Sequence, residues 1–198
     1  MYFVDLPRAL ESIAKRRFSV DEFKRLEVLI NDRKRGEVFT DLYLEKGADS
    51  NCLRYHFSVK SRDRSFTDSA IGNGVIICTR AGSTGYYSYL DKLRDGDWLE
   101  SNRYSMIKYN EIGVCHIAPI FTAREGEERS PLRYTVPWGS TFKMKLTRDA
   151  DARLFGITKS RTGIRIRVDD YVDVLPSSNT TRVIRPAPSV GLPYQPTE

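Results

Sequence analysis

Cysteine and histidine are scarce in this chain of 198 residues, which contains three cysteines and two histidines. Cys52, Cys78 and Cys115 are widely spaced and include no C-x-x-C pair, so the sequence predicts reduced thiols and no disulfide framework. His116 adjoins Cys115, but neighbouring residues of an extended chain point to opposite faces. We therefore expect a structural role for His116 and no metal site.

Long apolar runs are also missing. No run approaches the ~20 residues that a membrane-spanning helix needs, so we expect no membrane partner. The segment Met1 to Leu10 has no basic head followed by an apolar core, which is the pattern of a secretory signal. The expected location is cytoplasmic.

Positive charge is in modest excess, with a net charge of +6 and clusters at Lys15–Arg17 and Arg33–Arg35. This excess suits an anionic partner such as a nucleotide or a nucleic acid. Both clusters fall where we expect a helix end and a turn, and solvated basic residues are common there. Only Phe18 supplies an aromatic ring beside the first cluster, whereas nucleic-acid binding usually needs several. Of the three functions that the sequence allows, nucleic-acid binding therefore ranks last, and no nucleic-acid partner is expected.

Hydrophobic spacing predicts one helix near the start of the chain. Pro7 suits a first helical turn, and apolar residues recur at helical spacing up to Arg17. An extended run over Phe23 to Ile30, a turn at Arg33 to Gly36 and a second extended run over Val38 to Leu44 follow.

The rest of the chain reads mainly as strands. Residues 53–60 alternate strictly between apolar and polar, which is typical of a strand buried on one face. Further strands are predicted at Val75 to Cys78, Gly113 to Ile120, Ser140 to Leu146, Ala152 to Ile157, Gly163 to Val168, Tyr171 to Leu175 and Arg182 to Ile184. A polar loop is expected at Thr122 to Pro131. The predicted fold class is mainly β, a β-sandwich with one N-terminal helix and one short helix, Tyr86 to Leu93, after a glycine turn. One domain is expected over residues 1–185, followed by a proline-rich tail at 186–198.

The glycine turn, Thr79 to Tyr86, is the segment with the most chemical potential. Its small residues let a ligand approach the backbone, and its hydroxyls and N–H groups suit a phosphate, a ribose or a carboxamide. Tyr86 offers an aromatic face for a flat ring. The segment has neither a Gly-Lys-Ser/Thr ending nor a G-x-G-x-x-G fingerprint, and alone it also fits an ordinary turn.

Residues 72–86, Gly-Asn-Gly-Val-Ile-Ile-Cys-Thr-Arg-Ala-Gly-Ser-Thr-Gly-Tyr, resemble the G-D-G-hydrophobic-S-T-P-T-G-S-T-A-Y segment of the NAD kinase family. Other elements of that family follow in the same order. Thr40-Asp41 resembles its A-L-N-D/E element, residues 117–120 its L-T-P-I segment, residues 132–137 its F-R-P-L-V-hydrophobic-P segment, and residues 168–172 and 182–185 its closing stretch. The resemblance runs from about Phe3 to Arg185 and implies the β-rich, NAD-binding C-terminal domain of that family.

The resemblance also implies a nucleotide site. Asp41 would bind ribose hydroxyls, and Thr40 stands where the family has an adenine-binding asparagine. The turn residues Thr79, Gly82 and Ser83 belong to the same motif, and Thr84, Gly85 and Tyr86 would line the nicotinamide end. Asn73 replaces an aspartate that reaches the adenine bound to a neighbouring subunit. For Thr40 and Asp41 a plain strand start is the alternative, for Asn73 a Gly-Asn-Gly hairpin turn, and for Tyr86 a core position.

Two departures from the family pattern stand close to this site. Ser88-Tyr89-Leu90-Asp91 replaces the small A-G-G-P, so bulk is expected to narrow the pocket, and Phe155-Gly156-Ile157 stands roughly where the family has D-G-Q. The family's G-G-D-G-T motif, with its catalytic aspartate, does not occur in the sequence. We therefore expect no catalytic residue in this chain.

The sequence predicts an NAD kinase-like protein that binds NAD or NADP. Phosphorylation of NAD, with ATP or polyphosphate and Mg²⁺, would require a catalytic domain or a partner chain that supplies the missing motif. A non-catalytic nucleotide-binding or oligomerisation module is the second possibility. A homo-oligomer is expected in either case, because the family's site uses residues from a neighbouring subunit.

Overall fold

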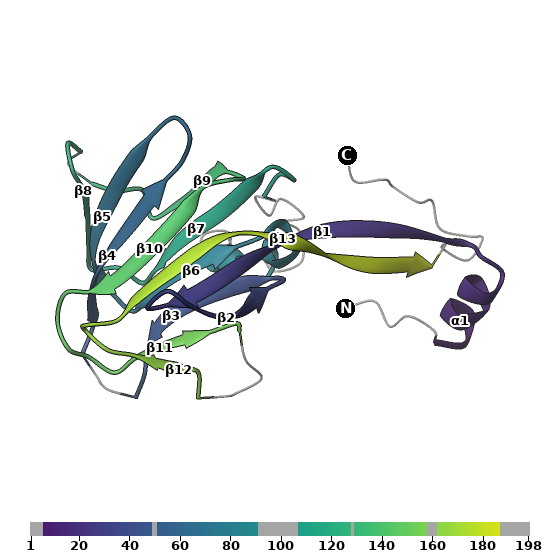
Figure 1. The fold of residues 1–198 in the computed structure, drawn as a ribbon, viewed down its shortest axis with the longest axis horizontal. Helices are drawn as coiled ribbons and strands as arrows, with labels where there is room; N and C mark the ends of the chain where they lie inside the picture. Colours follow the sequence, from purple (N-terminus) through teal and green to yellow (C-terminus); the bar gives the residue numbers. More distant parts are fainter. Residues whose placement is uncertain (1–5, 49–50, 91–106, 128, 158–161, 187–198) are drawn as a thin grey trace. The chain divides into compact units, whose positions relative to one another are not determined.

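The computed structural model describes residues 6–48, 51–90, 107–127, 129–157 and 162–186 (Figure 1). The chain forms two compact units, residues 1–23 with 180–198, and residues 24–179. The predicted domain over residues 1–185 with a tail at 186–198 stays a prediction, and residues 187–198 lie outside the described part. Within the described residues, no helix has both the length and the apolar character that crossing a membrane requires.

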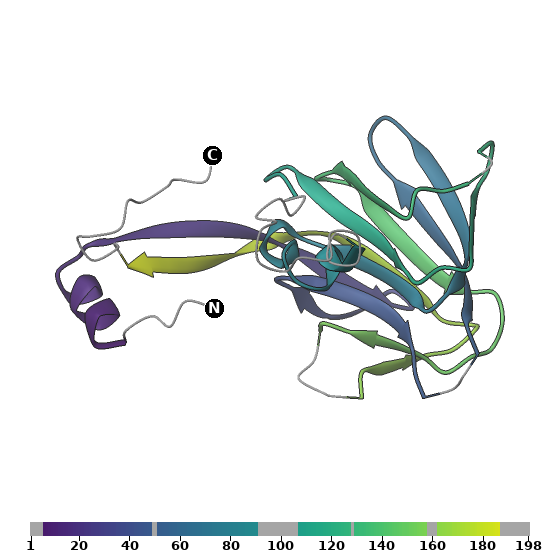
Figure 2. The same cartoon turned by 180° about the vertical axis from the view of Figure 1, so that it is seen from behind.

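Two antiparallel sheets make up the larger unit, which confirms the mainly β fold class (Figures 1 and 2). The seven-stranded sheet contains, in spatial order, β2 (Arg33–Val38), β1 (Phe18–Ile30), β13 (Tyr171–Pro186), β10 (Thr141–Leu146), β4 (Leu53–Lys60), β5 (Ser65–Gly72) and β8 (Phe121–Arg124). The six-stranded sheet contains β12 (Ile164–Ile166), β11 (Ala152–Phe155), β3 (Asp41–Lys46), β6 (Gly74–Cys78), β7 (Glu111–Ile117) and β9 (Arg133–Pro137). Strands β1 and β13 each have residues in both units.

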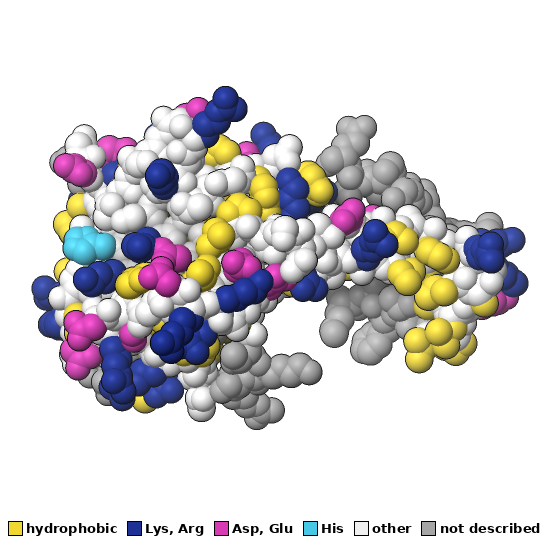
Figure 3. Space-filling model, in the orientation of Figure 1, with side chains coloured by type: hydrophobic (Ala, Val, Ile, Leu, Met, Phe, Trp, Pro, Cys, Tyr) yellow, Lys and Arg dark blue, Asp and Glu magenta, His cyan; other side chains and the backbone are white. Residues whose placement is uncertain are grey.

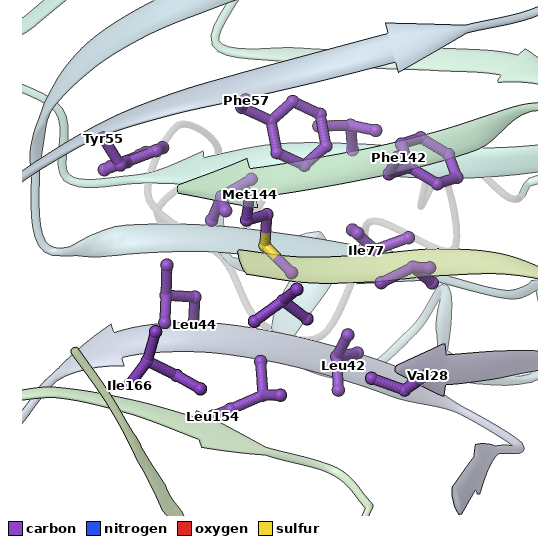
Figure 4. Packing of buried hydrophobic residues seen from close by; sticks show 14 of the residues in the cluster. Val28, Leu42, Leu44, Tyr55, Phe57, Ile77, Phe142, Met144, Leu154 and Ile166 are labelled. Atoms are coloured by element: carbon purple, nitrogen blue, oxygen red, sulfur yellow. The ribbon is translucent and has the colours of Figure 1, made fainter. Parts of the chain in front are cut away.

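The main hydrophobic core lies between the two sheets. Strand β4 buries every second side chain, as its alternating sequence predicts, and Phe57 of this strand packs near Phe142 with ring centroids 5.8 Å apart. Leu42, Leu44 and Ile77 face them from the six-stranded sheet (Figure 4). Each fully buried side chain of this size contributes roughly 1.5–3 kcal/mol to folding, so this layer is what holds the sandwich together.

The hairpin between β1 and β2 turns earlier than the sequence predicts. Asn31 and Asp32 have φ of 52° and 61°, the left-handed conformation of a two-residue hairpin turn. Strand β2 already begins at Arg33, so the turn predicted at Arg33 to Gly36 is wrong. Asparagine and aspartate tolerate this conformation better than most residues, and that signal outweighs the basic cluster beside it.

Strand β13 is longer than predicted, since it runs without a break from Tyr171 to Pro186 and joins two strands predicted separately. Pro176 and the Ser-Ser-Asn run after it interrupt the apolar pattern but not the pairing. The polar loop predicted at Thr122 to Pro131 is also partly wrong, because β8 extends through Arg124 and pairs with β5. In both places, pairing with a neighbouring strand overrides local composition.

The Gly72-Asn73-Gly74 segment is not a hairpin turn. Strand β5 before it belongs to the seven-stranded sheet and β6 after it to the six-stranded sheet, so the segment carries the chain from one sheet to the other. Gly74 has φ of 143°, and a Cβ there would lie 1.8 Å from the Leu44 carbonyl oxygen. This position therefore requires glycine.

The smaller unit contains the one helix that was predicted near the start of the chain. Helix α1 spans Leu6–Ala14 and ends three residues earlier than expected, because Arg16 adopts φ of 54°. None of its residues is buried. Among the described residues of this unit, the exposed large hydrophobic side chains are Leu6, Leu10, Phe18, Val20 and Ile184, and hydrophobic side chains gather beside α1 in the space-filling view (Figure 3).

A buried polar cluster links the two sheets and adjoins the apolar core, to which its member Tyr55 also belongs. We call it the Asp68 cluster; its members are Tyr55, Asp68, His116, Arg124, Ser130 and Tyr134. The Asp68 carboxylate accepts hydrogen bonds from Arg124 Nε at 2.7 Å and Nη2 at 3.1 Å, from Ser130 Oγ at 2.8 Å and from Tyr134 Oη at 2.8 Å. His116 lies between Asp68 and Tyr55, with its ring nitrogens 3.3 Å and 2.9 Å from them. His116 thus has the structural role that the sequence predicts.

These contacts keep Asp68 ionised. Burial of the carboxyl would raise its pKa, but hydrogen bonds from His116, Arg124, Tyr134 and Ser130 outweigh that effect and hold the pKa of Asp68 well below its usual range. Burial raises the pKa of Tyr134, and the Asp68 charge raises it further. Among the described residues, no buried side-chain nitrogen or oxygen lacks a hydrogen-bond partner.

Candidate functional site

Two segments that the sequence singles out, Thr40-Asp41 and Thr79 to Tyr86, lie side by side. Strand β3 pairs with β6 so that Asp41, its first residue, is opposite Cys78, the last residue of β6. The glycine turn leaves β6 at that end. It lies against the six-stranded sheet as two 3-10 turns, η1 (Arg80–Gly82) and η2 (Tyr86–Ser88) (Figure 2).

Thr79 attaches the glycine turn to the start of β3. Its backbone N–H donates to the Thr40 carbonyl at 2.8 Å, and its hydroxyl donates to the Phe39 carbonyl at 2.6 Å. The Ser83 hydroxyl donates within the turn, to the Arg80 carbonyl at 2.8 Å. Both side chains are almost completely buried, so these two hydroxyls shape the turn.

Gly82 is required by this close approach, because a Cβ there would lie 2.7 Å from the Thr40 carbonyl oxygen. A second glycine has the same function on the other flank of Asp41. Gly156, just after β11, has φ of 102°, and a Cβ on it would lie 2.2 Å from the Asp41 carbonyl oxygen. Both glycines therefore set the position of Asp41.

Exposed polar groups gather where these segments meet. Thr40, Thr84 and Gly85 are exposed, and Asp41 is half-buried. The Thr40 hydroxyl donates to Asp41 Oδ1 at 3.0 Å, and Asp41 Oδ2 lies 3.9 Å from the position of a Cβ on Gly85. This leaves carboxylate lone pairs, an exposed threonine hydroxyl and an open glycine backbone at one place on the surface.

Tyr86 contacts two other aromatic rings, those of Tyr43 and Tyr89. Tyr43 of β3 meets the Tyr86 ring edge-on, with centroids 5.5 Å apart, and stacks on Phe155 of β11 at 5.2 Å with an interplanar angle of 19°. We call Tyr43, Tyr86 and Phe155 the aromatic shelf; all three are half-buried. Tyr89 packs on the far side of Tyr86, at 5.8 Å.

The aromatic shelf lies beside carboxylates of β3. The Tyr86 hydroxyl donates to Glu45 Oε1 at 3.1 Å. Burial raises the pKa of Tyr86 and the Glu45 charge raises it further, while the pKa of Tyr43 is raised by burial, by Asp41 and by Glu45. The hydroxyls of both tyrosines therefore keep their protons at neutral pH and can donate hydrogen bonds.

The region after the glycine turn, predicted as a helix over Tyr86 to Leu93, begins differently from the prediction. Its first turn, Tyr86–Ser88, is a 3-10 helix followed by helical residues at 89 and 90, and the remainder of the helix predicted up to Leu93 lies outside the described residues. The narrowing of the pocket expected from the bulk of Ser88-Tyr89-Leu90-Asp91 stays a prediction, and Tyr89 is bound to backbone groups of residues 116 and 118. Its hydroxyl donates to the His116 carbonyl at 2.8 Å and accepts from the Ala118 N–H at 3.1 Å, so the ring lies over β7.

Asn73 is the predicted site residue that the structure does not bring to the others. It precedes β6, and the glycine turn follows the opposite end of this five-residue strand, roughly 16 Å away at ~3.3 Å per residue. Its backbone N–H donates to the Ile117 carbonyl and its carbonyl accepts from the Lys46 N–H, each at 2.9 Å. A contact of Asn73 with a ligand of a neighbouring subunit stays a prediction.

The structure adds three residues to this site: Tyr43 and Glu45, which sequence reasoning missed, and Phe155, which it noted only as a departure from the family pattern. The signal was present for two of them, because residues 41, 43 and 45 alternate along β3 and therefore share the face on which Asp41 lies. Phe155 is placed by the pairing of β11 with β3, which sets it opposite Tyr43. That pairing joins residues more than a hundred positions apart.

The arrangement is suited to binding a polar ligand that carries a flat ring. Carboxylate oxygens can accept from ribose hydroxyls, and aromatic faces can pack on a planar ring. Within the described residues, no group of three or more His, Cys, Asp or Glu side chains is placed to hold a metal ion.

Comparison with known proteins assigns the fold. No protein-family model matches the chain, and no curated protein matches its sequence. Among solved structures, that of yeast NADH kinase complexed with NADH superposes with a TM-score of 0.58 at 16% sequence identity, over 90% of this chain and 47% of the other. The chain thus spans about half the length of that kinase. Its fold is NAD kinase-like.

Proposed function

We propose that this chain binds a nicotinamide dinucleotide, NAD or NADP, where Thr40-Asp41 meets Thr79 to Tyr86, as the nucleotide-binding part of an NAD kinase-like protein. One observation carries the proposal: the two segments that resemble the family's ribose-binding and nicotinamide-binding elements are joined by the Thr79 hydrogen bonds to residues 39 and 40. The NADH bound in the structurally similar yeast kinase supports the choice of ligand.

Each group has a defined part in this proposal. The Asp41 carboxylate accepts from ribose hydroxyls, and exposed Thr84 and Gly85 face the ligand beside it. Tyr86 contributes its ring to the nicotinamide end, while Thr79, Gly82 and Ser83 hold the turn in shape. Thr40 offers one hydroxyl in place of an amide, so adenine loses one of its paired contacts.

Phosphoryl transfer is expected to require residues beyond this chain. Transfer from ATP or polyphosphate needs positioned phosphates, Mg²⁺ and a base for the ribose hydroxyl. The G-G-D-G-T motif that would supply the base and the phosphate contacts is absent from the 198 residues. We therefore propose that the isolated chain binds the dinucleotide without phosphorylating it, and NADP formation by the purified chain would contradict this.

Calorimetric titration of the chain with NAD, NADP and ATP tests the binding. Asp41→Ala and Tyr86→Ala are each expected to weaken dinucleotide binding about tenfold, which corresponds to one lost hydrogen-bonded charge or one lost ring contact. Asp173→Ala, at an ion pair with Lys143 on the other sheet, is the matched control and should bind normally. Unchanged affinity in both site variants would reject the site.

An assembly module is the second function, and the smaller unit favours it. The exposed large hydrophobic side chains of its described part suit burial against a second copy of this chain. Light scattering is expected to show an oligomer that Leu10→Glu with Phe18→Glu converts to a monomer. A monomeric wild-type chain would reject this second function.

A further inference from the structure

The aromatic shelf and its two carboxylates form one continuous surface on the outer face of β3. Asp41, Tyr43 and Glu45 project from the same face because side chains alternate along a strand. Phe155 extends the surface across to β11, opposite Tyr43, and Tyr86 closes it from above. A flat ring placed on this surface lies between two carboxylates.

The cation that strand pairing places opposite Glu45 is bonded to other groups. Arg153 lies opposite Glu45 in the strand pairing, but its Nε donates to Asp151 Oδ1 and its Nη1 to the Thr162 carbonyl, each at 3.1 Å. The charges that raise the pKa of Tyr43 are those of Asp41 and Glu45, after the larger effect of burial. Asp41 and Glu45 thus both act on Tyr43.

We propose that the aromatic shelf with Glu45 and Asp41 makes this site selective for the oxidised, positively charged nicotinamide ring over the reduced, neutral ring. The inference rests on the proposed function, and it deepens that function by naming the redox form of the ligand. A pyridinium cation is attracted both by the faces of aromatic rings and by nearby carboxylates, whereas the dihydropyridine ring of the reduced form lacks the charge.

Three ligands separate the contributions of ring and charge: NAD⁺, NADH, and ADP-ribose, which lacks the nicotinamide ring. The wild-type chain is expected to bind NAD⁺ about fivefold more tightly than NADH, as one exposed cation–π contact with a flanking carboxylate provides. ADP-ribose should bind more weakly than NADH, because the neutral ring of NADH still packs on the aromatic shelf. Calorimetry at low ionic strength measures all three.

Glu45→Gln removes the charge and keeps an amide oxygen that accepts from the Tyr86 hydroxyl. It is expected to lower the NAD⁺ to NADH preference to about twofold by weakening NAD⁺ binding alone. Tyr43→Leu removes the ring and should bring NAD⁺ affinity down to that of ADP-ribose. Asp173→Asn, which removes a carboxylate from the other sheet, is the control and should keep the fivefold ratio.

The outcomes distinguish this inference from the function on which it rests. A wild-type chain that binds neither dinucleotide overturns both. A chain that binds NAD⁺ and NADH equally, or a preference that Glu45→Gln leaves intact, overturns the selectivity and leaves dinucleotide binding standing. Circular dichroism of each variant establishes that it is folded before its affinities are compared.

Discussion

The molecule contains two polar clusters built from similar residues. One stabilises the fold, and the other is the candidate ligand site. In the Asp68 cluster the donors and acceptors face one another between the sheets, and the carboxylate is completely buried. At the candidate site Asp41 is half-buried, and Thr40 and Thr84 are exposed. A carboxylate saturated by its own protein stabilises a fold, whereas one with lone pairs left over can bind a ligand.

Asp68→Asn is the strongest way to break the first cluster. It leaves Arg124 buried without its counter-charge, and removal of one partner from a buried pair costs about 3–5 kcal/mol of unfolding free energy. Urea unfolding measures the loss. Asp173→Asn, which removes one partner of the solvent-exposed pair with Lys143, is the control and should cost less than about 1 kcal/mol. Equal losses in the two variants would mean that the Asp68 cluster is not a structural element.

Gly156→Ala should damage fold and site together. The residue has φ of 102°, and a Cβ would lie 2.2 Å from the Asp41 carbonyl oxygen, so we expect a loss of about 2–3 kcal/mol and weaker dinucleotide binding. Gly139→Ala is a close match: its φ is 105° and a Cβ there meets nothing within 4 Å. This control isolates the cost of backbone strain, about 1 kcal/mol, and should bind normally. Equal changes in stability and in dinucleotide affinity for Gly156→Ala and Gly139→Ala would show that the contact with Asp41 is unimportant.

The Asp68 cluster should also make the stability of the protein depend on pH. The folded-state pKa of Asp68 lies below the unfolded value of about 3.9, so the unfolded chain takes up a proton first as the pH falls. Stability from Asp68 is therefore complete above the unfolded pKa and is lost as the pH falls toward the folded one. Asp68 alone should account for about 1 kcal/mol of loss between pH 5 and pH 3.

Urea unfolding of wild type and Asp68→Asn at both pH values measures this contribution. Both proteins are kept in the same concentration of sucrose, which stabilises the folded state. The variant should lose less stability over the interval. Glu37 has a folded-state pKa of about 2, lowered chiefly by hydrogen bonds from Asn179 and Lys34 against the opposing effect of burial, so it adds to the loss in both proteins. Parallel curves for wild type and Asp68→Asn would contradict the assignment of the acid sensitivity to Asp68.

The two clusters were not equally visible in the sequence. Thr79 to Tyr86 and Thr40-Asp41 were predictable, because a local motif needs only the order of residues along the chain. Strand β4 was predictable for the same reason, since its alternation is local. The Asp68 cluster draws on β4, β5, β7, β8, β9 and on Ser130, which lies three residues before β9, and its charged members lie 56 residues apart. Only the strand order brings them together.

Strand pairing also explains which contacts at the site the sequence did not reveal. Phe155 joins Tyr43 through the pairing of β11 with β3, and Thr79 uses its hydroxyl on the backbone of residue 39. Neither of these partners is close in sequence. The turn appeared to offer three hydroxyls, but that of Thr79 is bound to the Phe39 carbonyl and that of Ser83 to the Arg80 carbonyl. Composition shows which groups are present, and only the fold shows which of them remain available.

Thr84→Ala tests most sharply whether the candidate site, unlike the Asp68 cluster, contains groups that the fold does not need. Its expected effect on folding is the smallest. The side chain is exposed, so the free energy of unfolding should change by less than about 0.5 kcal/mol. Dinucleotide affinity should fall by about threefold, as the loss of one neutral hydrogen bond predicts. Thr79→Ala, which removes the hydroxyl that donates to the Phe39 carbonyl, is the counterpart and should cost about 1 kcal/mol or more in stability. If Thr84→Ala alters stability as much as Thr79→Ala does, Thr84 belongs to the fold and the candidate site loses its exposed donor.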